Sequence, residues 1–456
     1  MYGSLKEECG VFGIYSDKLD NAKLTMYGLF AMQHRGQESA GIASTDGYGI
    51  SSHKEMGLVS SVFADERNLE KLKGNIAIGH VRYSTTGASG VINAQPLVIR
   101  HSKGDLAIAH NGNLVNTDSI KEKLEKQGSI FQTSNDTEVI LHLVARSLKD
   151  AIEDSILDAL SQVKGAYSIL FMTNNKLIAV RDPLGMRPLV LGKKGDSYIF
   201  ASETPALDLV GAEYIREVEP GEMIIIDKNG MDAKKVFHRE RTAKCIFELI
   251  YFGRPDSNLF SRNVHLLRKE VGRQLARENK IDADLVIPVP DSGVSSALGY
   301  AEESGIPYEF GIMRNHYVGR TFIQPNQLDR ELGVKKKLSP IPDVIRGKRI
   351  VVVDDSIVRG TTSRKIVKLL KKAGAKEIHL LIAAPPVTFP CYYGIDLPTR
   401  KELIAATHTL EEIRKYILAD SLAYLSIEGL HKAVKAEKNE FCDACFTGNY
   451  PVKFTK

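Results

Sequence analysis

The sequence of 456 residues contains no long apolar run. No uninterrupted apolar stretch approaches the roughly 20 residues that a helix needs to cross a bilayer. The N-terminal segment Met1–Glu8 also lacks the apolar core of a secretory signal. We therefore expect a cytoplasmic protein with no membrane partner.

An excess of charge of one sign is also missing. The chain has 61 Lys and Arg against 56 Asp and Glu, a net charge of +5. Such a small and dispersed surplus gives no indication of nucleic-acid binding, although it would not repel a phosphorylated substrate. There is no low-complexity run, and 26% of the residues are charged, which excludes disordered, collagen-like and coiled-coil classes.

Cysteine is scarce and odd in number, with five residues: Cys9, Cys245, Cys391, Cys442 and Cys445. In a reducing cytosol this speaks against a disulfide framework and for a metal site or a nucleophile. Cys442 and Cys445 have metal-ligand spacing, and Cys245 and Cys391 complete a set of four thiolates if Cys9 serves elsewhere. The count and spacing fit zinc and an iron–sulfur cluster equally well, and the alternative is that Cys245 and Cys391 are isolated core thiols.

The length predicts two or three domains. The first half has short strand-like runs punctuated by glycine, as at 11–15, 76–83 and 106–110, with helical stretches at 22–33 and 136–148, which predicts an α+β domain. A last strand over Met223–Ile226 and a polar turn precede a boundary that we place near residue 240. The predicted domains are 9–240 and 241–456.

The second half predicts strand-loop-helix units on a parallel sheet. The apolar strands Leu285–Val289 and Arg349–Val353 each run into a polar loop and then a helical pattern. In the second helix Ile366 and Leu370 share one face, and Gly374 ends the helix before a strand at 377–383. This is one βαβ crossover of an α/β domain.

The loop after the second strand carries paired carboxylates and a Gly-Thr-Thr sequence. Carboxylates at the C-terminal end of a parallel strand lie where α/β sheets bind ligands, and Gly-Thr-Thr offers amides and hydroxyls to a phosphate at a helix N-terminus. The pattern suits a phosphorylated sugar with a divalent metal, whereas the alternative is that these residues only cap the helix. The residues are Asp354, Asp355, Ser356, Arg359, Gly360, Thr361 and Thr362.

This loop resembles the phosphoribosylpyrophosphate signature of the type I phosphoribosyltransferases. The resemblance implies that Asp354 and Asp355 handle the ribose hydroxyls and Mg²⁺, and that the segment Ser356–Thr362 holds the 5′-phosphate. It places Ser292, within the turn at 288–293, near the metal. It also implies that Arg314–Gln324, which includes Arg320, is a mobile lid over the pyrophosphate, with an exposed basic loop as the alternative.

Cys9 is followed by four polar segments in the first half: Gln33–Glu38, Gly79–Thr85, His110–Leu114 and Asn135–Glu138. Separately each has a structural reading, since Asn111-Gly112 is typical of a hairpin turn and a lone cysteine is usually a small buried apolar residue. Together and in this order they resemble the glutamine amidotransferase domain of the N-terminal-nucleophile hydrolases. In that class the nucleophile is the first residue of the mature chain, because its own α-amino group is the general base.

The resemblance assigns a role to each matching residue. Cys9 becomes the nucleophile, which implies that Met1–Glu8 is a leader peptide that is removed. Arg82 pairs with the glutamine carboxylate and Asp136 with its ammonium group. Asn111 and Gly112 form the oxyanion hole, and Arg35 and Tyr83 shape the glutamine pocket and its closing loop.

The two halves and the cysteines together resemble the glutamine phosphoribosylpyrophosphate amidotransferases, the family of the first committed step of de novo purine synthesis. The resemblance implies phosphoribosylpyrophosphate and glutamine as substrates, Mg²⁺ as a cofactor and purine nucleotides as feedback inhibitors. It implies a homo-oligomer, a tetramer by analogy. It also implies a structural 4Fe-4S cluster, held by Cys245, Cys391, Cys442 and Cys445.

Two rival functions have features that this sequence does not match. A glutamine–fructose-6-phosphate aminotransferase would carry sugar-isomerase modules in place of the segment Asp354–Ser363. A purine-sensing regulator that binds DNA would need a helix-turn-helix and a basic face in its N-terminal region. The nucleophile set around Cys9 favours catalysis instead.

Overall fold

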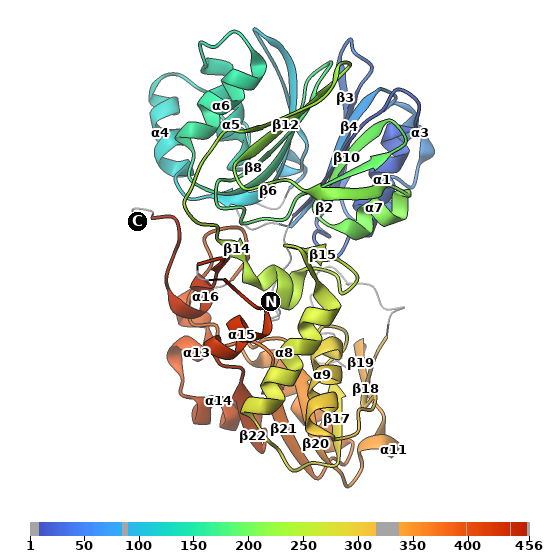
Figure 1. Cartoon of the computed structure of the whole chain (residues 1–456), viewed down its shortest axis with the longest axis vertical. Helices are drawn as coiled ribbons and strands as arrows, with labels where there is room; N and C mark the ends of the chain where they lie inside the picture. The colour runs from blue at the N-terminus through green and yellow to red at the C-terminus, as the bar shows by residue number, and fades with distance from the viewer. Residues whose placement is uncertain (1–8, 84–89, 316–336, 398, 438, 454–456) are drawn as a thin grey trace.

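The structure is a computed structural model that describes residues 9–83, 90–315, 337–397, 399–437 and 439–453. The chain forms two lobes, with the first half of the sequence in one and the second half in the other (Figure 1). Strands β14 (Lys244–Cys245) and β15 (Asn258–Leu259) and helix α16 (Ala444–Thr447) lie at the junction. Among the described residues, no helix combines the length and apolarity needed to span a bilayer.

The first lobe contains two antiparallel sheets. The larger has the strand order β11-β9-β10-β1-β4-β2-β3 and the smaller β13-β12-β8-β7-β6-β5. The larger consists of β1 (Gly10–Tyr15), β2 (Ser39–Thr45), β3 (Ile50–Met56), β4 (Ile76–Arg82), β9 (Val190–Lys194), β10 (Ser197–Ala201) and β11 (Glu213–Glu217). The smaller consists of β5 (Leu97–His101), β6 (Gly104–Leu114), β7 (Gly165–Met172), β8 (Leu177–Arg181), β12 (Glu222–Asp227) and β13 (Gly230–Lys235).

Helices cover the outer faces of both sheets, so the lobe has four layers. The strands are buried on both sides because alternate residues face opposite layers. In β4, Ile76 and Ile78 pack between the sheets, whereas Ala77 and Val81 pack toward the helices of the larger sheet. These helices are α1 (Asn21–Ala31), α2 (Val59–Val62), α3 (Glu66–Glu70) and α7 (Thr204–Val210); the smaller sheet carries α4 (Thr117–Lys126), α5 (Thr137–Arg146) and α6 (Ile152–Gln162), and the short helix η1 is Val91–Asn93.

The second lobe is built on a parallel sheet of order β17-β20-β21-β22. Val351 and Val353 of β20 face one core, and Ile350 and Val352 face the other, so both faces are covered. The strands are β17 (Leu285–Pro288), β20 (Arg349–Asp354), β21 (Glu377–Ile382) and β22 (Ser421–Tyr424). Helices α8 (Val264–Glu278), α9 (Val294–Ser304) and α15 (Ile427–Ala433) cover the first face, and α12 (Thr361–Lys372), α13 (Ile404–Thr407) and α14 (Leu410–Ile417) the second.

Short elements complete the second half: the π-helix η2 (Glu248–Phe252), the partner strand β16 (Arg262–Asn263) of β15, the pair β18 (Ile312–Arg314) and β19 (Leu338–Pro340), α11 (Pro342–Ile345), η3 (Arg400–Glu402) and β23 (Phe441–Cys442). The expected α+β and α/β classes are both confirmed. The boundary proposed near residue 240 falls between β13 and β14.

The structural alternative for Asn111-Gly112 is wrong. Asn111 and Gly112 do not form a hairpin turn; they lie inside the long strand β6, where they pair with Ser168 and Tyr167 of β7. The turn dipeptide is overridden because both residues continue the ladder with β7, which extends to Leu114, beyond the point at Ile108 where the pairing with β5 ends.

Candidate active sites

Cys9 stands immediately before β1, at one end of the larger sheet. Its thiol donates to the carbonyl oxygen of Tyr83 at 3.6 Å, which places Tyr83 at the sulfur. Strand β1 pairs with β4, so the start of β1 lies beside the end of β4 that carries Arg82. The sequence-predicted residues Cys9, Arg82 and Tyr83 are therefore brought together.

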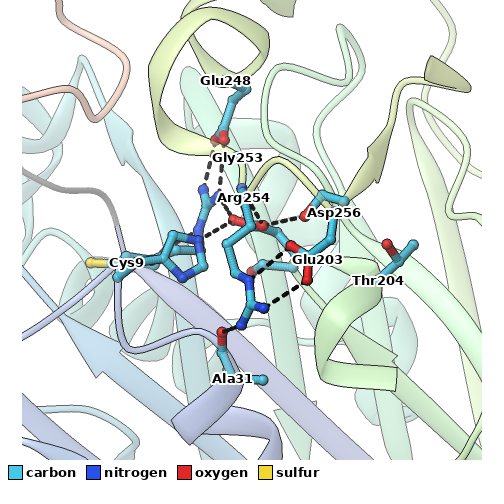
Figure 2. A network of polar contacts seen from close by, with 12 residues as sticks. Cys9, Ala31, Glu203, Thr204, Glu248, Gly253, Arg254 and Asp256 are labelled. Atoms are coloured by element: carbon cyan, nitrogen blue, oxygen red, sulfur yellow. Dashed lines mark hydrogen bonds and ion pairs between the residues drawn. The ribbon is translucent and has the colours of Figure 1, made fainter. Parts of the chain in front are cut away.

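A buried network of charged side chains holds the backbone of Cys9. The Arg35 Nε atom donates to the Cys9 carbonyl oxygen at 3.0 Å. The rest of the guanidinium binds two carboxylates, Glu203 at 2.6 Å and Glu248 at 2.7 and 2.9 Å. In Figure 2 the sulfur of Cys9 points away from Glu203 and Glu248. The network therefore binds the backbone of Cys9 and does not include its thiol.

Glu203 remains an anion in this network. Burial alone would raise the pKa of its carboxyl group, but the charges of His34 and Arg35 and hydrogen bonds from His34 and Ser257 hold that pKa well below its usual range. His34 Nε2 lies 2.8 Å from Glu203 Oε1, and Ser257 Oγ donates to Oε2 at 2.5 Å. The backbone N–H of Arg254 donates to the same oxygen at 3.0 Å (Figure 2).

Arg82 and Asp136 are both buried and engaged with protein groups. Arg82 Nη1 donates to Glu38 Oε1 at 3.0 Å, so a protein carboxylate holds the cation that was expected to meet the substrate carboxylate. Asp136 Oδ2 accepts from the backbone N–H of Leu114 at 2.9 Å, and Thr137 donates to Oδ1 at 3.3 Å. These bonds tie Asp136 to the end of β6.

The proposed oxyanion residues lie on β6, close to the start of β1. Asn111 Nδ2 donates to Ser202 Oγ at 3.5 Å, and the same oxygen accepts from the backbone N–H of Val11 at 3.0 Å. Gly112 has a φ of 151°, and a Cβ atom there would lie 2.0 Å from the carbonyl oxygen of Ala166. Only glycine fits at residue 112.

A second site lies at the C-terminal end of β20, where Asp354, Asp355, Ser356, Gly360, Thr362 and the more distant Ser292 line one pocket. Gly360 has a φ of 71° and turns the chain into α12. The hydroxyl of Thr361 is buried without a hydrogen-bond partner among the described residues. Amides at a helix N-terminus and an unpartnered hydroxyl suit a phosphate.

Two negative charges on Asp354 and Asp355 are unfavourable unless a cation lies close to them, because the carboxylates are adjacent and buried. Burial, and then the charge of Asp355, raises the pKa of Asp354 well above its usual range. Asp354 Oδ1 accepts the backbone N–H of Asp355 at 3.0 Å, and Ser356 Oγ donates to Asp355 Oδ2 at 2.5 Å. Adjacent buried carboxylates of this kind suit a divalent cation with oxygen ligands.

Arg359, a predicted phosphoribosylpyrophosphate ligand, stands apart from this pocket. Arg359 does not line it and donates instead to Glu402 at 2.7 Å. Arg320 and the rest of 316–324 lie outside the described residues; Arg314, at the end of β18, donates to Asp291 at 2.5 Å.

The four remaining cysteines share one cavity at the junction of the lobes, with Met186, Arg187, Tyr393 and Tyr450 also in its wall. Cys245 and Cys442 are register partners of the parallel pair β14–β23, Cys445 lies on α16, and the Cys391 sulfur accepts the N–H of Tyr393 at 3.3 Å. No group of three or more His, Cys, Asp or Glu side chains among the described residues has an arrangement that could hold a single metal ion. Cys245 and Cys391 nevertheless line the same cavity as Cys442 and Cys445.

Burial governs the acidity of these thiols. The pKa of Cys442 is raised to about 12, mainly by burial, with a backbone hydrogen bond from Ala444 opposing and the nearby Cys391 and Asp443 adding to the rise. Burial and then the nearby Cys245, Cys442 and Cys391 raise the pKa of Cys445 well above its usual range. Thiolates are unfavourable in this buried cavity unless positive charge accompanies them. The four cysteines therefore suit a cationic group with sulfur ligands.

Several residues of these sites were not predicted from the sequence. Glu203, Glu248 and Arg187 complete the network at Cys9, and Tyr251 lines the phosphate pocket. A signal was available for Glu248, because it is the only charged residue within the apolar run 245–252.

Comparisons with known proteins match both halves. Residues 80–209 match the glutamine amidotransferase domain family, and residues 265–386 the phosphoribosyl transferase domain family. The amidophosphoribosyltransferase of Bacillus subtilis is 53% identical over 454 residues, which cover 98% of this chain and 95% of the relative. That of Methanocaldococcus jannaschii is 51% identical over 464 residues, 98% of each chain.

Two solved structures match at nearly full length. A structure described as the allosteric regulatory enzyme of purine biosynthesis has a TM-score of 0.94 and 52% identity, and the match covers 98% of this chain and 97% of that one. The glutamine phosphoribosylpyrophosphate amidotransferase of B. subtilis, in complex with ADP and GMP, has a TM-score of 0.92 and 53% identity over 98% of both chains.

Proposed function

The chain belongs to the amidophosphoribosyltransferase family, and from that membership we propose how its residues divide the reaction between two sites. Enzymes of this family catalyse the first step of purine biosynthesis. They convert phosphoribosylpyrophosphate, glutamine and water into 5-phosphoribosylamine, glutamate and pyrophosphate. The observation that carries the proposal is one chain with a thiol at the head of β1 and a phosphate loop at the end of β20.

In the first half-reaction the Cys9 thiol attacks the amide carbonyl of glutamine. Its own α-amino group takes the thiol proton and passes a proton to the leaving nitrogen, which departs as ammonia. Water then hydrolyses the thioester to glutamate. This base exists only if the leader Met1–Glu8 is cleaved, so the mature chain begins at Cys9.

The other residues of this site bind glutamine or stabilise the transition state. The Asn111 side chain and the Gly112 N–H donate to the oxyanion, a pair whose individual members typically contribute about 3 kcal/mol. Arg82 binds the substrate carboxylate and Asp136 its ammonium group. Tyr83 and Arg35 shape the pocket at the thiol, in line with their contacts to the sulfur and to the backbone of Cys9.

In the second half-reaction ammonia attacks C1 of the ribose and pyrophosphate leaves. The N-terminus of α12, with Ser356, Gly360, Thr361 and Thr362, holds the 5′-phosphate, and we assign Arg359 and Arg320 to the same substrate. Asp354 and Asp355 bind the ribose hydroxyls and, with Ser292, would hold Mg²⁺. When bound, the metal supplies positive charge that neutralises the leaving pyrophosphate.

The four-cysteine cavity would hold a 4Fe-4S cluster. Its thiols come from β14, from the loop at Cys391 and from residues 442–445. A bound cluster would therefore link β14, at the junction of the lobes, to the C-terminal segment. We assign it no redox role, because the reaction transfers no electrons.

Regulation, assembly and location follow the family. Purine nucleotides are proposed as feedback inhibitors, a suggestion supported by the complex of the B. subtilis relative with ADP and GMP. A homo-oligomer, by analogy a tetramer, is proposed for the subunit arrangement. The thiols, none of which forms a disulfide, suit a reducing compartment such as the cytoplasm.

The test is to measure phosphoribosylamine, glutamate and pyrophosphate together on the purified enzyme, with Mg²⁺ present, alongside its intact mass. We expect equal amounts of the three products from a chain that starts at Cys9. Full glutamine-dependent activity from a chain that keeps Met1–Glu8 would contradict the N-terminal mechanism.

A further inference from the structure

We propose that Glu248, contributed by the phosphoribosyltransferase half, is a positioning residue of the glutaminase site. It does not line the phosphate pocket, and the hydrogen bonds of its carboxylate to described residues go to arginine side chains. It acts through two buried arginines, one of which holds the backbone of the nucleophile, while the other holds a segment packed against the oxyanion strand. The inference rests on the proposed function, in which Cys9 attacks glutamine beside Asn111 and Gly112.

The Glu248 carboxylate binds both arginines at once. Oε1 accepts from Arg35 Nη2 at 2.7 Å and lies 3.4 Å from Arg187 Nη1, and Oε2 accepts from Arg35 Nη1 at 2.9 Å. The three side chains are at most 1% exposed. A bidentate pair between arginine and a carboxylate fixes orientation as well as distance, because two parallel bonds define the plane of the guanidinium.

The Arg35 arm of this arrangement reaches the nucleophile. With Nη1 and Nη2 fixed on Glu248, Nε points to the carbonyl oxygen of Cys9 at 3.0 Å. In an N-terminal nucleophile the thiol and the general base belong to the same residue. A bond to its carbonyl therefore orients both reacting groups of Cys9.

The Arg187 arm reaches the oxyanion strand. Arg187 Nε and Nη2 both donate to the carbonyl oxygen of Tyr393, at 3.0 and 2.6 Å. The next residue, Gly394, packs so closely on the oxyanion residue that a Cβ added to it would lie 3.2 Å from the carbonyl carbon of Gly112. Asn113 Nδ2 donates to the Tyr392 carbonyl at 3.0 Å, which seats the same segment on β6.

Glu248 itself is held by a rigid element of the second half. It is the first residue of the π-helix η2, a type of turn that is frequent at functional sites. The buried Arg268 of α8 donates to the carbonyls of Leu249 and Gly253, both at 2.8 Å. In the same helix Tyr251 lines the pocket of Asp354 and Asp355, so one short element contacts the phosphoribosyl site and anchors the glutaminase site.

A stable junction between the halves does not require an ion network. Well-packed apolar residues often replace a buried ion network without loss of stability. What an apolar replacement cannot provide is a fixed hydrogen-bond direction toward the Cys9 and Tyr393 carbonyls. Displacements of about 1 Å remote from the chemistry can cost about a hundredfold in rate, which is the effect that such an anchor prevents.

The test compares Glu248→Gln with the unsubstituted enzyme, using glutamine and ammonium as separate nitrogen sources. We expect kcat with glutamine to fall about ten- to a hundredfold, and KM for glutamine to change by about threefold or less, because the residues that bind glutamine remain. The rate with ammonium should stay unchanged, since Glu248 does not line the phosphate pocket. Glu428→Gln is the matched control: it makes the same change at an exposed carboxylate on α15 of the same half of the chain, and both rates should stay unchanged.

Arg187→Lys is the second variant, which keeps the charge but cannot donate to Tyr393 from two nitrogens. It should lower kcat with glutamine selectively and so tests the proposal if Glu248→Gln does not fold. An equal loss with both nitrogen sources, or no loss with glutamine, would overturn the positioning role. Failure of the proposed function is distinguishable, because Cys9→Ala would then keep its glutamine-dependent rate.

Discussion

At the scale of single residues, a few close neighbours determine the charge state of each functional side chain. Asp354 is the plainest case, because burial and the adjacent Asp355 both disfavour its charge. We predict that Asp354→Asn or Asp355→Asn lowers phosphoribosylamine formation more than about tenfold with glutamine and with ammonium alike. Rates titrated against Mg²⁺ would check this. Asp343→Asn, at an exposed position of α11, should leave these rates unchanged. Unaffected turnover with ammonium in the Asp354 variant would contradict the assignment.

At this scale the sequence predicted what lies close along the chain. Asp354, Asp355, Gly360 and Thr362 lie within nine positions of one another. A short pattern was therefore enough to predict residues that line one pocket. Glu248 and Arg35 are 213 positions apart, and their pairing follows from how the two halves pack. Likewise, no local pattern could reveal that Arg359 binds Glu402 outside the pocket.

Between elements, the two sheets of the first lobe are joined by a buried histidine. His80 of β4 lies against β6, where its Nε2 atom is 3.0 Å from the His110 carbonyl oxygen. Burial lowers the pKa of His80 from 6.5 to about 3, with the nearby cation Arg82 also lowering it and the bond to His110 opposing. The folded chain therefore keeps His80 neutral where the unfolded chain takes up a proton, and the free energy of unfolding falls as the pH drops from 6.5 toward 3.

We predict that His80→Gln, which retains a donor for His110, loses less stability on acidification. In the unsubstituted enzyme, His80 should lower the free energy of unfolding by about 2 kcal/mol at pH 5 relative to neutral pH, because each pH unit below 6.5 costs about 1.4 kcal/mol. Urea unfolding at pH 7.5 and pH 5 measures the difference. His238→Gln, on an exposed loop, serves as the control. Parallel losses in His80→Gln and the unsubstituted enzyme would argue against a buried neutral His80.

The cysteine cavity joins elements from three parts of the chain. Cys442→Ser removes one thiol from the β14–β23 pair, and we predict loss of iron and acid-labile sulfide together with poor folding. Metal and sulfide content of anaerobically purified protein would show it. Stoichiometric zinc without iron in the unsubstituted protein would contradict the cluster. Spacing alone left zinc and iron equally open, and it could not show that Cys245 pairs in register with Cys442.

At the scale of helices and strands, local sequence patterns did not predict where β6 ends. The expected strand at 106–110 is the middle of β6, which runs on through Asn111 and Gly112 to Leu114. Turn propensity is a property of two residues, whereas strand pairing with β7 involves the whole sheet. The parallel strands of the second lobe were easier to predict because they are apolar on both faces.

On the scale of the whole molecule, the proposed reaction passes ammonia from the site in the first lobe to the site in the second. We predict that glutamine hydrolysis is slow alone and rises when phosphoribosylpyrophosphate binds, since ammonia lost to solvent would waste glutamine. Where phosphoribosylpyrophosphate also raises the affinity for glutamine, linkage requires that glutamine tighten phosphoribosylpyrophosphate binding by the same factor as that gain in affinity. Glutamate release measured with and without the sugar phosphate tests this, and equal rates would refute it.

The measurement that bears most directly on the account is phosphoribosylamine formation by Cys9→Ala with glutamine and with ammonium, in the presence of phosphoribosylpyrophosphate and Mg²⁺. The thiol belongs only to the glutaminase site, and Asp354 and Asp355 belong to the other lobe. We predict that the glutamine-dependent rate is abolished and the ammonium-dependent rate is retained. Loss of both rates in a folded variant, or retention of the glutamine-dependent rate, would contradict the assignment of two separate sites with Cys9 as the nucleophile.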